Sequence, residues 1–233
     1  ESTNTQEVDD YFVTNRNEKE QSVRMPPASL VFDAYSSGSQ PTDPALAVGP
    51  NHVMVVFNTG FAIYDKAGNE LQGPTSPNPA IFPSGGCCDL TASYDNAADR
   101  WVLTFLGSGA QVAVSDGPNP LTAGWFVYTI GAISDYQKLS VWSDGYYITE
   151  NTNGFNKEWA LERSAMLAGN LGAKVLGFEL PRIVVSDFFS PQVLNVTDNN
   201  LPAAVGATVV YMQDNDWNGV STDHIKLWTI DVD

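Results

Sequence analysis

The chain has 233 residues, of which 11% are aromatic and only 16% are charged. That balance suits packed β-sheets and argues against a helical or disordered chain. The formal net charge of −16 excludes nucleic acid and anionic membrane surfaces as partners, because both require clustered Lys and Arg. No run approaches the roughly 18 apolar residues of a membrane helix, so no membrane span is expected.

Residues 1–28 are polar and charged, with few side chains to bury, and are predicted to form an arm or linker. The remainder, 29–233, is predicted to be one β domain. A proline pair separates the arm from Ser29–Tyr35, which has the composition of a strand that could close against a sheet elsewhere.

Predicted strands then follow in four groups along the chain. In the clearest group, short β-prone runs are separated by the polar break 95–99, by GSG at 107–109 and by DGP at 116–118. Such short connections leave no room for crossover helices, so the strands must pair as antiparallel hairpins. The predicted strands are 46–48, 52–58, 61–66 and a stunted 70–71; 91–94, 100–106, 111–115 and 124–130; 139–142, 146–151, 158–163 and 174–180; and 208–213 and 224–232.

The groups repeat at intervals of about 45–48 residues, from Val53 to Trp101 to Tyr146. A repeat of that length built from four strands is typical of a β-propeller blade. The sequence therefore predicts an all-β fold with four-stranded antiparallel blades, of which about three and a half are visible. Because each blade buries its faces only against its neighbours, we expect the chain to be part of a larger propeller.

One short helix and one cysteine pair interrupt this pattern. Residues 164–169 have a capping Ser164 and a terminal Gly169, which predicts a single helical turn after a strand. Cys87 and Cys88 are adjacent. They could form a vicinal disulfide, pair with cysteines outside this chain, or remain reduced and buried.

Several segments resemble a known family. They are TDPALAVGPNHVMVVFN (42–58) with FAIYDKAGNEL, ASYDNAADRWVLTF (92–105) with QVAVSD, and DYQKLSVWSDGYYIT (135–149) with ALERSAMLAG. Together they are similar to a group of large secreted or surface-attached bacterial proteins with a β-propeller region. The resemblance covers residues 41–233 and implies a propeller fold, export from the cell, and adhesive or carbohydrate-related neighbouring domains. It implies no catalytic residues, and CCDL at 87–90 departs from the small-residue, Asp and Pro pattern of the family.

The sharpest candidate for a metal site is the acidic loop DNDWNG at 214–219. Asp214, Asp216, Asn218 and Asp223 offer oxygen ligands at alternating positions, and Gly219 allows a tight turn, which suits a hard cation such as calcium. Position twelve is Ile225 where an EF-hand loop has Glu, so the loop departs from that motif. The alternative is a solvated acidic hairpin turn.

Candidate catalytic carboxylates lie near predicted strand ends. Two carboxylates that converge there could hydrolyse a glycosidic bond. Asp95, with the nearby Asp99, is equally well placed to cap backbone amides, and Arg100 could pair with a carboxylate between blades. The four candidates are Asp89, Asp95, Asp135 and Glu150.

Aromatic pairs within predicted strands offer a second type of site. One ring of Tyr146-Tyr147 and one of Trp125-Phe126 should face outward by the period-two rule, and could stack on sugars or anchor a protein. The alternative is packing between blades. Asn195-Val196-Thr197 matches the N-glycosylation pattern, which also occurs by chance.

The sequence thus predicts an extracellular or cell-surface β-propeller that acts as a binding or structural interaction module, stiffened by calcium. Its expected partners are a surface protein or glycan and the remainder of a larger polypeptide or assembly. The alternatives are a secreted carbohydrate-active enzyme and a subunit of a surface filament. No catalytic or cofactor-binding residue is assigned.

Overall fold

The computed structural model of the chain describes residues 28–152, 154, 156–186, 189–196, 198–202 and 205–232. The chain divides into two compact units, Glu1–Asp33 and Ala34–Asp233. The predicted arm, except residue 28, lies outside the described residues. All the described strands belong to the second unit.

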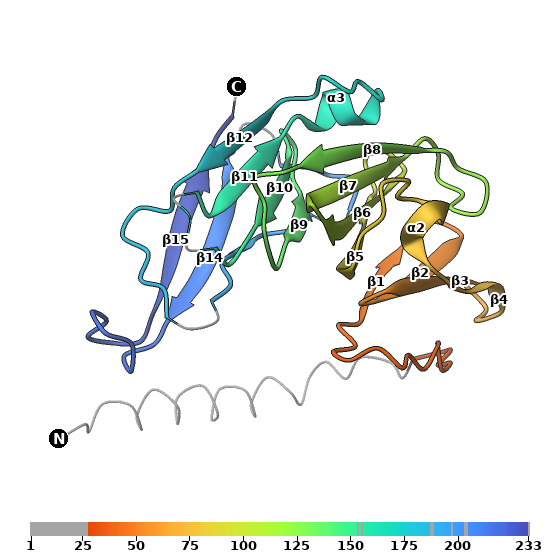
Figure 1. Ribbon diagram of the computed structural model, residues 1–233, viewed down its shortest axis with the longest axis horizontal. Coiled ribbons are helices and arrows are strands. Elements are labelled where there is room, and N and C mark those ends of the chain that lie inside the picture. The colour runs from red at the N-terminus through yellow and green to blue at the C-terminus, as the bar shows by residue number, and fades with distance from the viewer. Residues whose placement is uncertain are drawn as a thin grey trace. The chain divides into compact units, whose positions relative to one another are not determined.

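The second unit contains four antiparallel sheets that follow one another in chain order (Figure 1). Three of them have four strands and the last has three, and within each sheet every strand pairs with the next one along the chain. Sheet 1 contains β1 (Ala45–Val48), β2 (His52–Phe57), β3 (Gly60–Asp65) and β4 (Glu70–Thr75). Sheet 2 contains β5 (Cys88–Asp95), β6 (Arg100–Gly107), β7 (Gly109–Ser115) and β8 (Trp125–Ile130). Sheet 3 contains β9 (Lys138–Val141), β10 (Tyr146–Thr149), β11 (Glu158–Leu161) and β12 (Val175–Phe178). Sheet 4 contains β13 (Gln192–Val193), β14 (Ala207–Gln213) and β15 (His224–Ile230).

Polar turn residues fix the hairpins that join these strands. Between β3 and β4, Asp65 Oδ1 accepts hydrogen bonds from the backbone N–H groups of Ala67 and Asn69, both at 2.8 Å. Between β7 and β8, Asp116 Oδ1 accepts one from the N–H of Gly124 at 2.8 Å. The Asx turn at Asp65 and the loop closed by Asp116 let consecutive strands pair as hairpins, as the sequence predicted.

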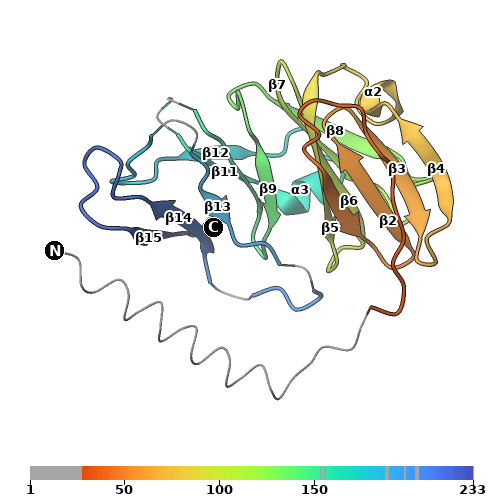
Figure 2. The same ribbon diagram turned by 90° about the horizontal axis from the view of Figure 1, so that it is seen from below.

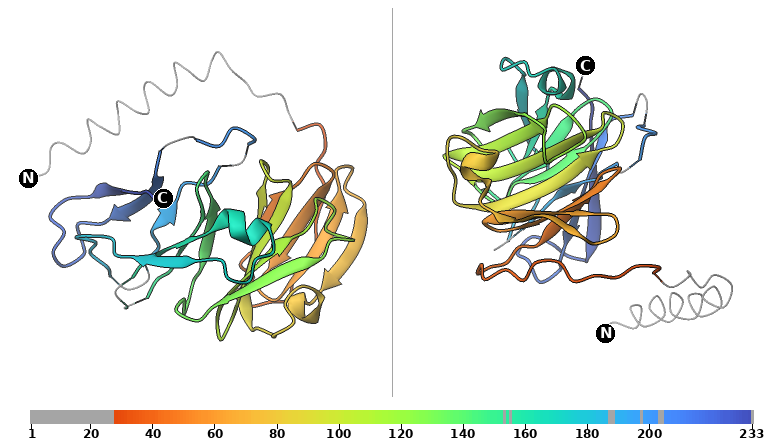
Figure 3. Two further views of the ribbon diagram at one scale, coloured as in Figure 1. Left: turned by 90° about the horizontal axis from the view of Figure 1, so that it is seen from above. Right: turned by 90° about the vertical axis from the view of Figure 1, so that its right-hand side faces the viewer.

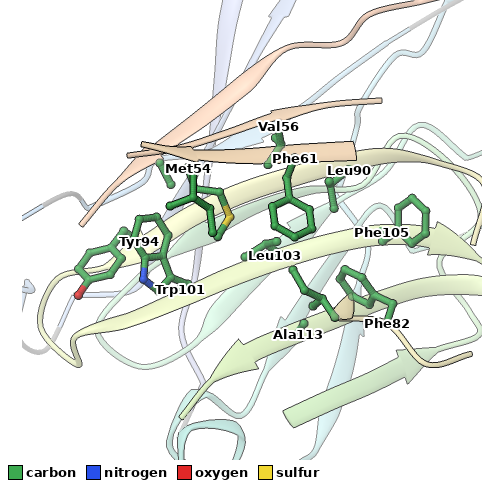
Figure 4. Packing of buried hydrophobic residues seen from close by; sticks show 13 residues of the cluster. Met54, Val56, Phe61, Phe82, Leu90, Tyr94, Trp101, Leu103, Phe105 and Ala113 are labelled. Carbon is green, nitrogen blue, oxygen red and sulfur yellow. The ribbon is translucent and has the colours of Figure 1, made fainter. Parts of the chain in front are cut away.

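Successive sheets pack face to face through apolar side chains that alternate along the strands. Met54 on β2 and Phe61 on β3 meet Trp101 and Leu103 on β6 between sheets 1 and 2 (Figure 4). The Trp101 ring lies 4.8 Å from that of Tyr94 and donates from Nε1 to the Pro118 carbonyl at 2.9 Å. Burying each such side chain stabilises the fold by about 1.5–3 kcal/mol. Equivalent clusters lie between sheets 2 and 3 and between sheets 3 and 4.

The first strand of each sheet contacts the first strand of the next. Contacts join β1 to β5, β5 to β9, and β9 to β13, so the sheets form a series when seen from below in Figure 2. We refer to β1, β5, β9 and β13 as the innermost strands. The all-β prediction is confirmed, and the four predicted strand groups correspond to the four sheets.

Some local predictions were wrong. No strand forms over residues 29–35, because β-prone composition makes a strand only where another backbone pairs with it. The fourth strand of sheet 1 is not stunted, since β4 extends over six residues with shifts in its pairing to β3. The short helix α2 (Pro77–Ala80) was not predicted.

The predicted helical turn exists as α3 (Arg163–Leu167), but Ser164 does not cap it. The N-cap residue is Glu162, and it makes no side-chain capping bond. Gly169 adopts the expected left-handed conformation with φ of 69° after the helix ends. Tyr128 on β8 donates to the Met166 carbonyl at 3.1 Å, which fixes the helix, shown in teal in Figure 3, against sheet 2.

Candidate binding site at the ends of the innermost strands

A left-handed residue occurs at the beginning of three innermost strands. Asp43 has φ of 43°, Asp89 of 56° and Tyr136 of 53°. Asp43 and Tyr136 each lie two residues before β1 and β9, and Asp89 lies two residues before Thr91, where regular pairing of β5 with β6 begins. A non-glycine residue in this conformation costs of order 1–3 kcal/mol and persists only where its surroundings impose it.

Two buried amides impose the conformation at Asp89. Asn58, which follows β2, accepts a hydrogen bond from the Asp89 N–H on its Oδ1 at 2.6 Å. Gln137, which precedes β9, donates from Nε2 to the Asp89 carbonyl at 2.7 Å. Asn58 also donates from Nδ2 to the Pro41 carbonyl at 3.2 Å. The ends of sheets 1, 2 and 3 are therefore tied together at one point.

Charged groups from the same three sheets gather at this point. Burial raises the pKa of the Asp89 carboxyl, Lys138 opposes that rise, and the Asp135 and Asp43 carboxylates add to it. Burial likewise lowers the pKa of Lys138, against the influence of Asp89, Asp43 and Asp135. Asp89 and Lys138 thus each lie within electrostatic reach of the other three groups. We call Asp43, Asp89, Asp135 and Lys138 the inner-strand cluster.

The Lys138 ammonium forms no ion pair with any of these three carboxylates. It lies 3.7 Å from the centroid of the Tyr136 ring, and no ion pair joins it to a carboxylate in the described part of the chain. A half-buried cation surrounded by carboxylates but not bonded to them keeps donors and acceptors available to a ligand.

The two cysteines adjoin the cluster on the side of sheet 2. Cys87 and Cys88 form a disulfide with each other, so the vicinal alternative is the one the structure contains. The N–H of Cys87 donates to the Leu106 carbonyl at 2.8 Å, which fixes the loop to β6. Cys87 is exposed and Cys88 is half-buried, which places a small apolar surface directly before Asp89.

Of the four predicted catalytic carboxylates, only Asp89 and Asp135 come together in the cluster. Asp95 lies at the opposite end of β5, fully buried. It accepts hydrogen bonds from Arg163 Nε at 2.6 Å and Nη2 at 2.9 Å, and from the Tyr146 hydroxyl at 2.8 Å. Burial, reinforced by the Asp95 charge, raises the pKa of Tyr146. This group joins sheet 2 to sheet 3 and has a structural role.

The fourth carboxylate, Glu150, is also occupied. It is buried and accepts hydrogen bonds from the Ser134 N–H and from Trp159 Nε1, both at 2.9 Å. Among the described residues Arg100 forms no ion pair with a carboxylate, and its Nη1 donates to the carbonyls of Ala98 and Asp99 at 3.1 and 3.0 Å. Asp95 does cap a backbone amide, that of Ala98 at 3.1 Å.

The acidic loop between β14 and β15 uses two of its predicted ligands as turn acceptors. Asp214 Oδ1 accepts from the Asp216 N–H, and Asp223 Oδ1 accepts from the Asn215 N–H, both at 2.8 Å. Among the described residues, no group of three or more His, Cys, Asp or Glu side chains is arranged to hold a metal ion. Asn218 lies in the same turn and is exposed. Calcium binding by this loop stays a prediction.

The aromatic pairs pack between sheets, Tyr146 and Tyr147 completely and Trp125 and Phe126 in part. Tyr146 and Tyr147 are both fully buried, and Trp125 and Phe126 pack on opposite faces of sheet 2 against separate clusters. Asn195 accepts a hydrogen bond from the Val141 N–H at 2.7 Å, while the third residue of its glycosylation pattern lies outside the described residues.

Sequence reasoning missed Asp43, Asn58, Gln137 and Lys138. Aligning the repeats strand by strand would have placed Asp43 over Asp89, because both lie two residues before the regular part of an innermost strand. Nothing in the sequence marks Lys138, whose place in the cluster depends on the contact between β5 and β9.

Comparison with known proteins adds no assignment to this geometry: no family model, curated protein or solved structure matches the chain. None of the helices in the described ranges is both long and apolar enough to cross a membrane.

Proposed function

We propose that the chain is a portion of an extracellular or cell-surface β-propeller that binds neutral glycans at the inner-strand cluster. The propeller arrangement is supported by four consecutive antiparallel sheets whose first strands contact one another in sequence. A disulfide on an exposed loop supports an oxidising location outside the cell.

The observation that carries the binding function is the cluster itself. Three sheets each hold a strained residue at the same position, and the charged groups beside them remain available to a ligand. Strained residues of this kind concentrate at ligand-binding sites. In folds of this type, ligands bind where loops from several repeats meet.

The chemistry of the cluster favours a neutral sugar. Carboxylates at Asp43, Asp89 and Asp135 can accept hydrogen bonds from sugar hydroxyls, and the Lys138 ammonium can donate to a hydroxyl or ring oxygen. The disulfide at Cys87 and Cys88 offers an apolar surface for the carbon face of a sugar ring. The net charge of −16 repels anionic glycans, so acidic sugars are disfavoured.

Binding can be measured with an array that carries neutral and acidic oligosaccharides, followed by calorimetry on the strongest neutral hit. Lys138→Met and Asp89→Asn should each weaken binding about tenfold, which corresponds to ~1.4 kcal/mol. Asp116→Asn, on the β7–β8 turn, should bind like the parent chain. The proposal fails if no neutral glycan binds, or if the control variant weakens binding as much as the cluster variants do.

The same cluster also favours a second candidate function, the hydrolysis of glycosidic bonds. Because burial raises the pKa of Asp89, this carboxyl keeps its proton to a higher pH than a free Asp, as a general acid requires. Asp135, which is exposed, would then be the carboxylate that activates water or attacks the sugar. Release of reducing ends from the bound oligosaccharide, abolished in Asp89→Asn, would distinguish hydrolysis from binding alone.

A further inference from the structure

The last sheet of the series has one strand fewer than the others. Sheets 1, 2 and 3 each end in an outermost strand, β4, β8 or β12, which pairs with the third strand of its sheet. In sheet 4 the third strand is β15, and within the described ranges no strand pairs with its outer edge (Figure 1). The backbone N–H and C=O groups along that edge can therefore pair with another chain.

The β15 strand is also more exposed than any other third strand. The corresponding strands β3, β7 and β11 contain no exposed residue, whereas Ile225 and Leu227 on β15 are 67% and 65% exposed. A place at one end of the series does not explain this difference, because sheet 1 lies at the other end and its Ala62 and Tyr64 on β3 are 0% and 4% exposed. The exposure of β15 thus coincides with its open edge.

The regularity of β15 makes this edge suitable for pairing. Edge strands are commonly kept from pairing by proline, by bulges or by short length. The outermost strand β4 contains Gly73 and Pro74 and pairs with β3 through shifts in register. In contrast, β15 contains neither Gly nor Pro and pairs with β14 without interruption from His224 to Ile230. An added strand would therefore find seven consecutive residues in extended conformation.

A cavity of about 340 Å³ lies beside the C-terminal half of β15. Residues 178–181 and 228–231 line it. Trp228 and Ile230 are on the side of β15 that packs toward sheet 3. The lining is apolar apart from Thr229 and the two exposed carboxylates of Glu179 and Asp231. Because side chains alternate along a strand, an added strand would direct every second side chain toward this cavity.

We propose that β15 takes up a fourth strand from a partner protein, and that this strand is an extended segment in which basic and apolar residues alternate. The strand pairs antiparallel with β15, as all described neighbouring strands do in these sheets. Its apolar side chains lie beside Ile225 and Leu227. Its Lys or Arg side chains enter the cavity, where their stems pack on Trp228 and their charged ends meet Glu179 and Asp231.

The mode of recognition and the charge of the chain both favour such a partner. In strand addition, backbone hydrogen bonds supply affinity and pockets for alternate side chains supply specificity. The net charge of −16 attracts a basic segment and opposes the approach of a second copy of the chain. No member of the inner-strand cluster lines this cavity, so the proposal does not depend on glycan binding.

Binding of synthetic peptides to the whole chain tests this proposal, measured by fluorescence anisotropy. The probes are labelled nine-residue peptides in which Lys or Arg alternates with Val, Ile or Leu. They should bind, and more weakly as salt rises, whereas the same peptides with Glu in place of the basic residues should not bind. An antiparallel strand bonds to its neighbour through alternate residues. N-methylation of one alternate set of amides should therefore abolish binding, and N-methylation of the other set should leave it intact.

Two variants locate the bound peptide, each with a matched control. Leu227→Lys should weaken binding about fivefold, because it places a like charge beside the added strand. Leu171→Lys, on the loop after α3 where Leu171 is 80% exposed, should bind like the parent chain. Glu179→Gln should also weaken binding, up to about fivefold. Glu70→Gln on β4 removes the same charge from sheet 1 and should have no effect. All four variants should keep the thermal midpoint of the parent chain.

Three results would overturn the proposal. The first is that none of the basic peptides binds. The second is that both N-methylated sets bind, or that Leu227→Lys binds as well as Leu171→Lys, since binding would then be general attraction to an acidic protein. The third is that the chain alone forms a dimer in light scattering that Leu227→Lys dissociates, which would assign the edge of β15 to a second copy.

Discussion

Breaking the ion pair of Asp95 with Arg163 should unfold the protein at a much lower temperature. The Asp95 carboxylate is fully buried and the Arg163 side chain is only 14% exposed, so neither charge is solvated well once its partner is gone. Removing one partner of such a pair destabilises a protein by about 3–5 kcal/mol, because an uncompensated charge remains inside. In Arg163→Met, the Tyr146 hydroxyl and the Ala98 N–H remain as hydrogen-bond partners of Asp95, and neither carries a positive charge.

The expected change in melting temperature follows from the size of the unit. At about 2–4 °C per kcal/mol for a unit of this length, Arg163→Met should melt roughly 6–20 °C lower than the parent chain. Asp216→Asn, an exposed carboxylate on the β14–β15 turn, is the control and should melt within about 2 °C of the parent chain. The double variant Asp95→Asn with Arg163→Met should recover part of the loss, since it leaves no unpaired charge. If Arg163→Met melts at the same temperature as the control, the ion pair of Asp95 with Arg163 does not stabilise the contact between sheets 2 and 3, and this reasoning is refuted.

Three further predictions concern other groups. Burial raises the pKa of Glu158 well above its ordinary value, so the carboxyl loses its proton at a lower pH in the unfolded chain than in the folded one, and the folded state loses stability as pH rises. Calorimetry should therefore show that Glu158→Gln melts at least about 2 °C higher than the parent chain at pH 7 and no higher at pH 4. Denatured, unreduced protein should show no free thiols with a colorimetric reagent, because Cys87 and Cys88 are bonded to each other, and a titre of two thiols per chain would contradict this. If the Asp214 loop binds calcium, excess calcium should raise the melting temperature by linkage and a chelator should lower it, and Asp214→Asn should remove the effect; identical curves would leave the loop as a solvated turn.

The sequence predicted most of the fold because its signals are local. The turn at Asp65 follows from Asx chemistry, and the alternation along 111–115 indicates which side chains face which sheet. What could not be predicted depends on pairing between distant segments. Residues 29–35 have strand composition but form no strand, and the two-residue β13 exists only because Val193 pairs with Val209.

The candidate site was only half predictable for the same reason. Asp89 and Asp135 stood out as carboxylates near strand ends, but the amides that fix Asp89 come from other sheets and are separated from it by 31 and 48 residues. The acidic loop at Asp214 attracted the metal prediction because its spacing is visible in one short segment. One carboxylate oxygen each of Asp214 and Asp223 accepts a hydrogen bond from a backbone N–H of the same turn, and calcium binding by this loop stays a prediction.

The two aspartates of β5 show why residue type alone does not assign a role. Asp95 lies at one end of the strand, where its oxygens accept two hydrogen bonds from Arg163 and one from the Tyr146 hydroxyl. Asp89 sits at the other end, where its backbone is held by two amides while its carboxyl faces a lysine that bonds to none of the neighbouring carboxylates. A carboxylate whose oxygens already accept hydrogen bonds from the protein stabilises the fold, whereas one whose oxygens are not bonded by the protein can still bind a ligand. For that reason ligand binding should depend on Asp89 and not on Asp95, whereas unfolding should show the opposite dependence.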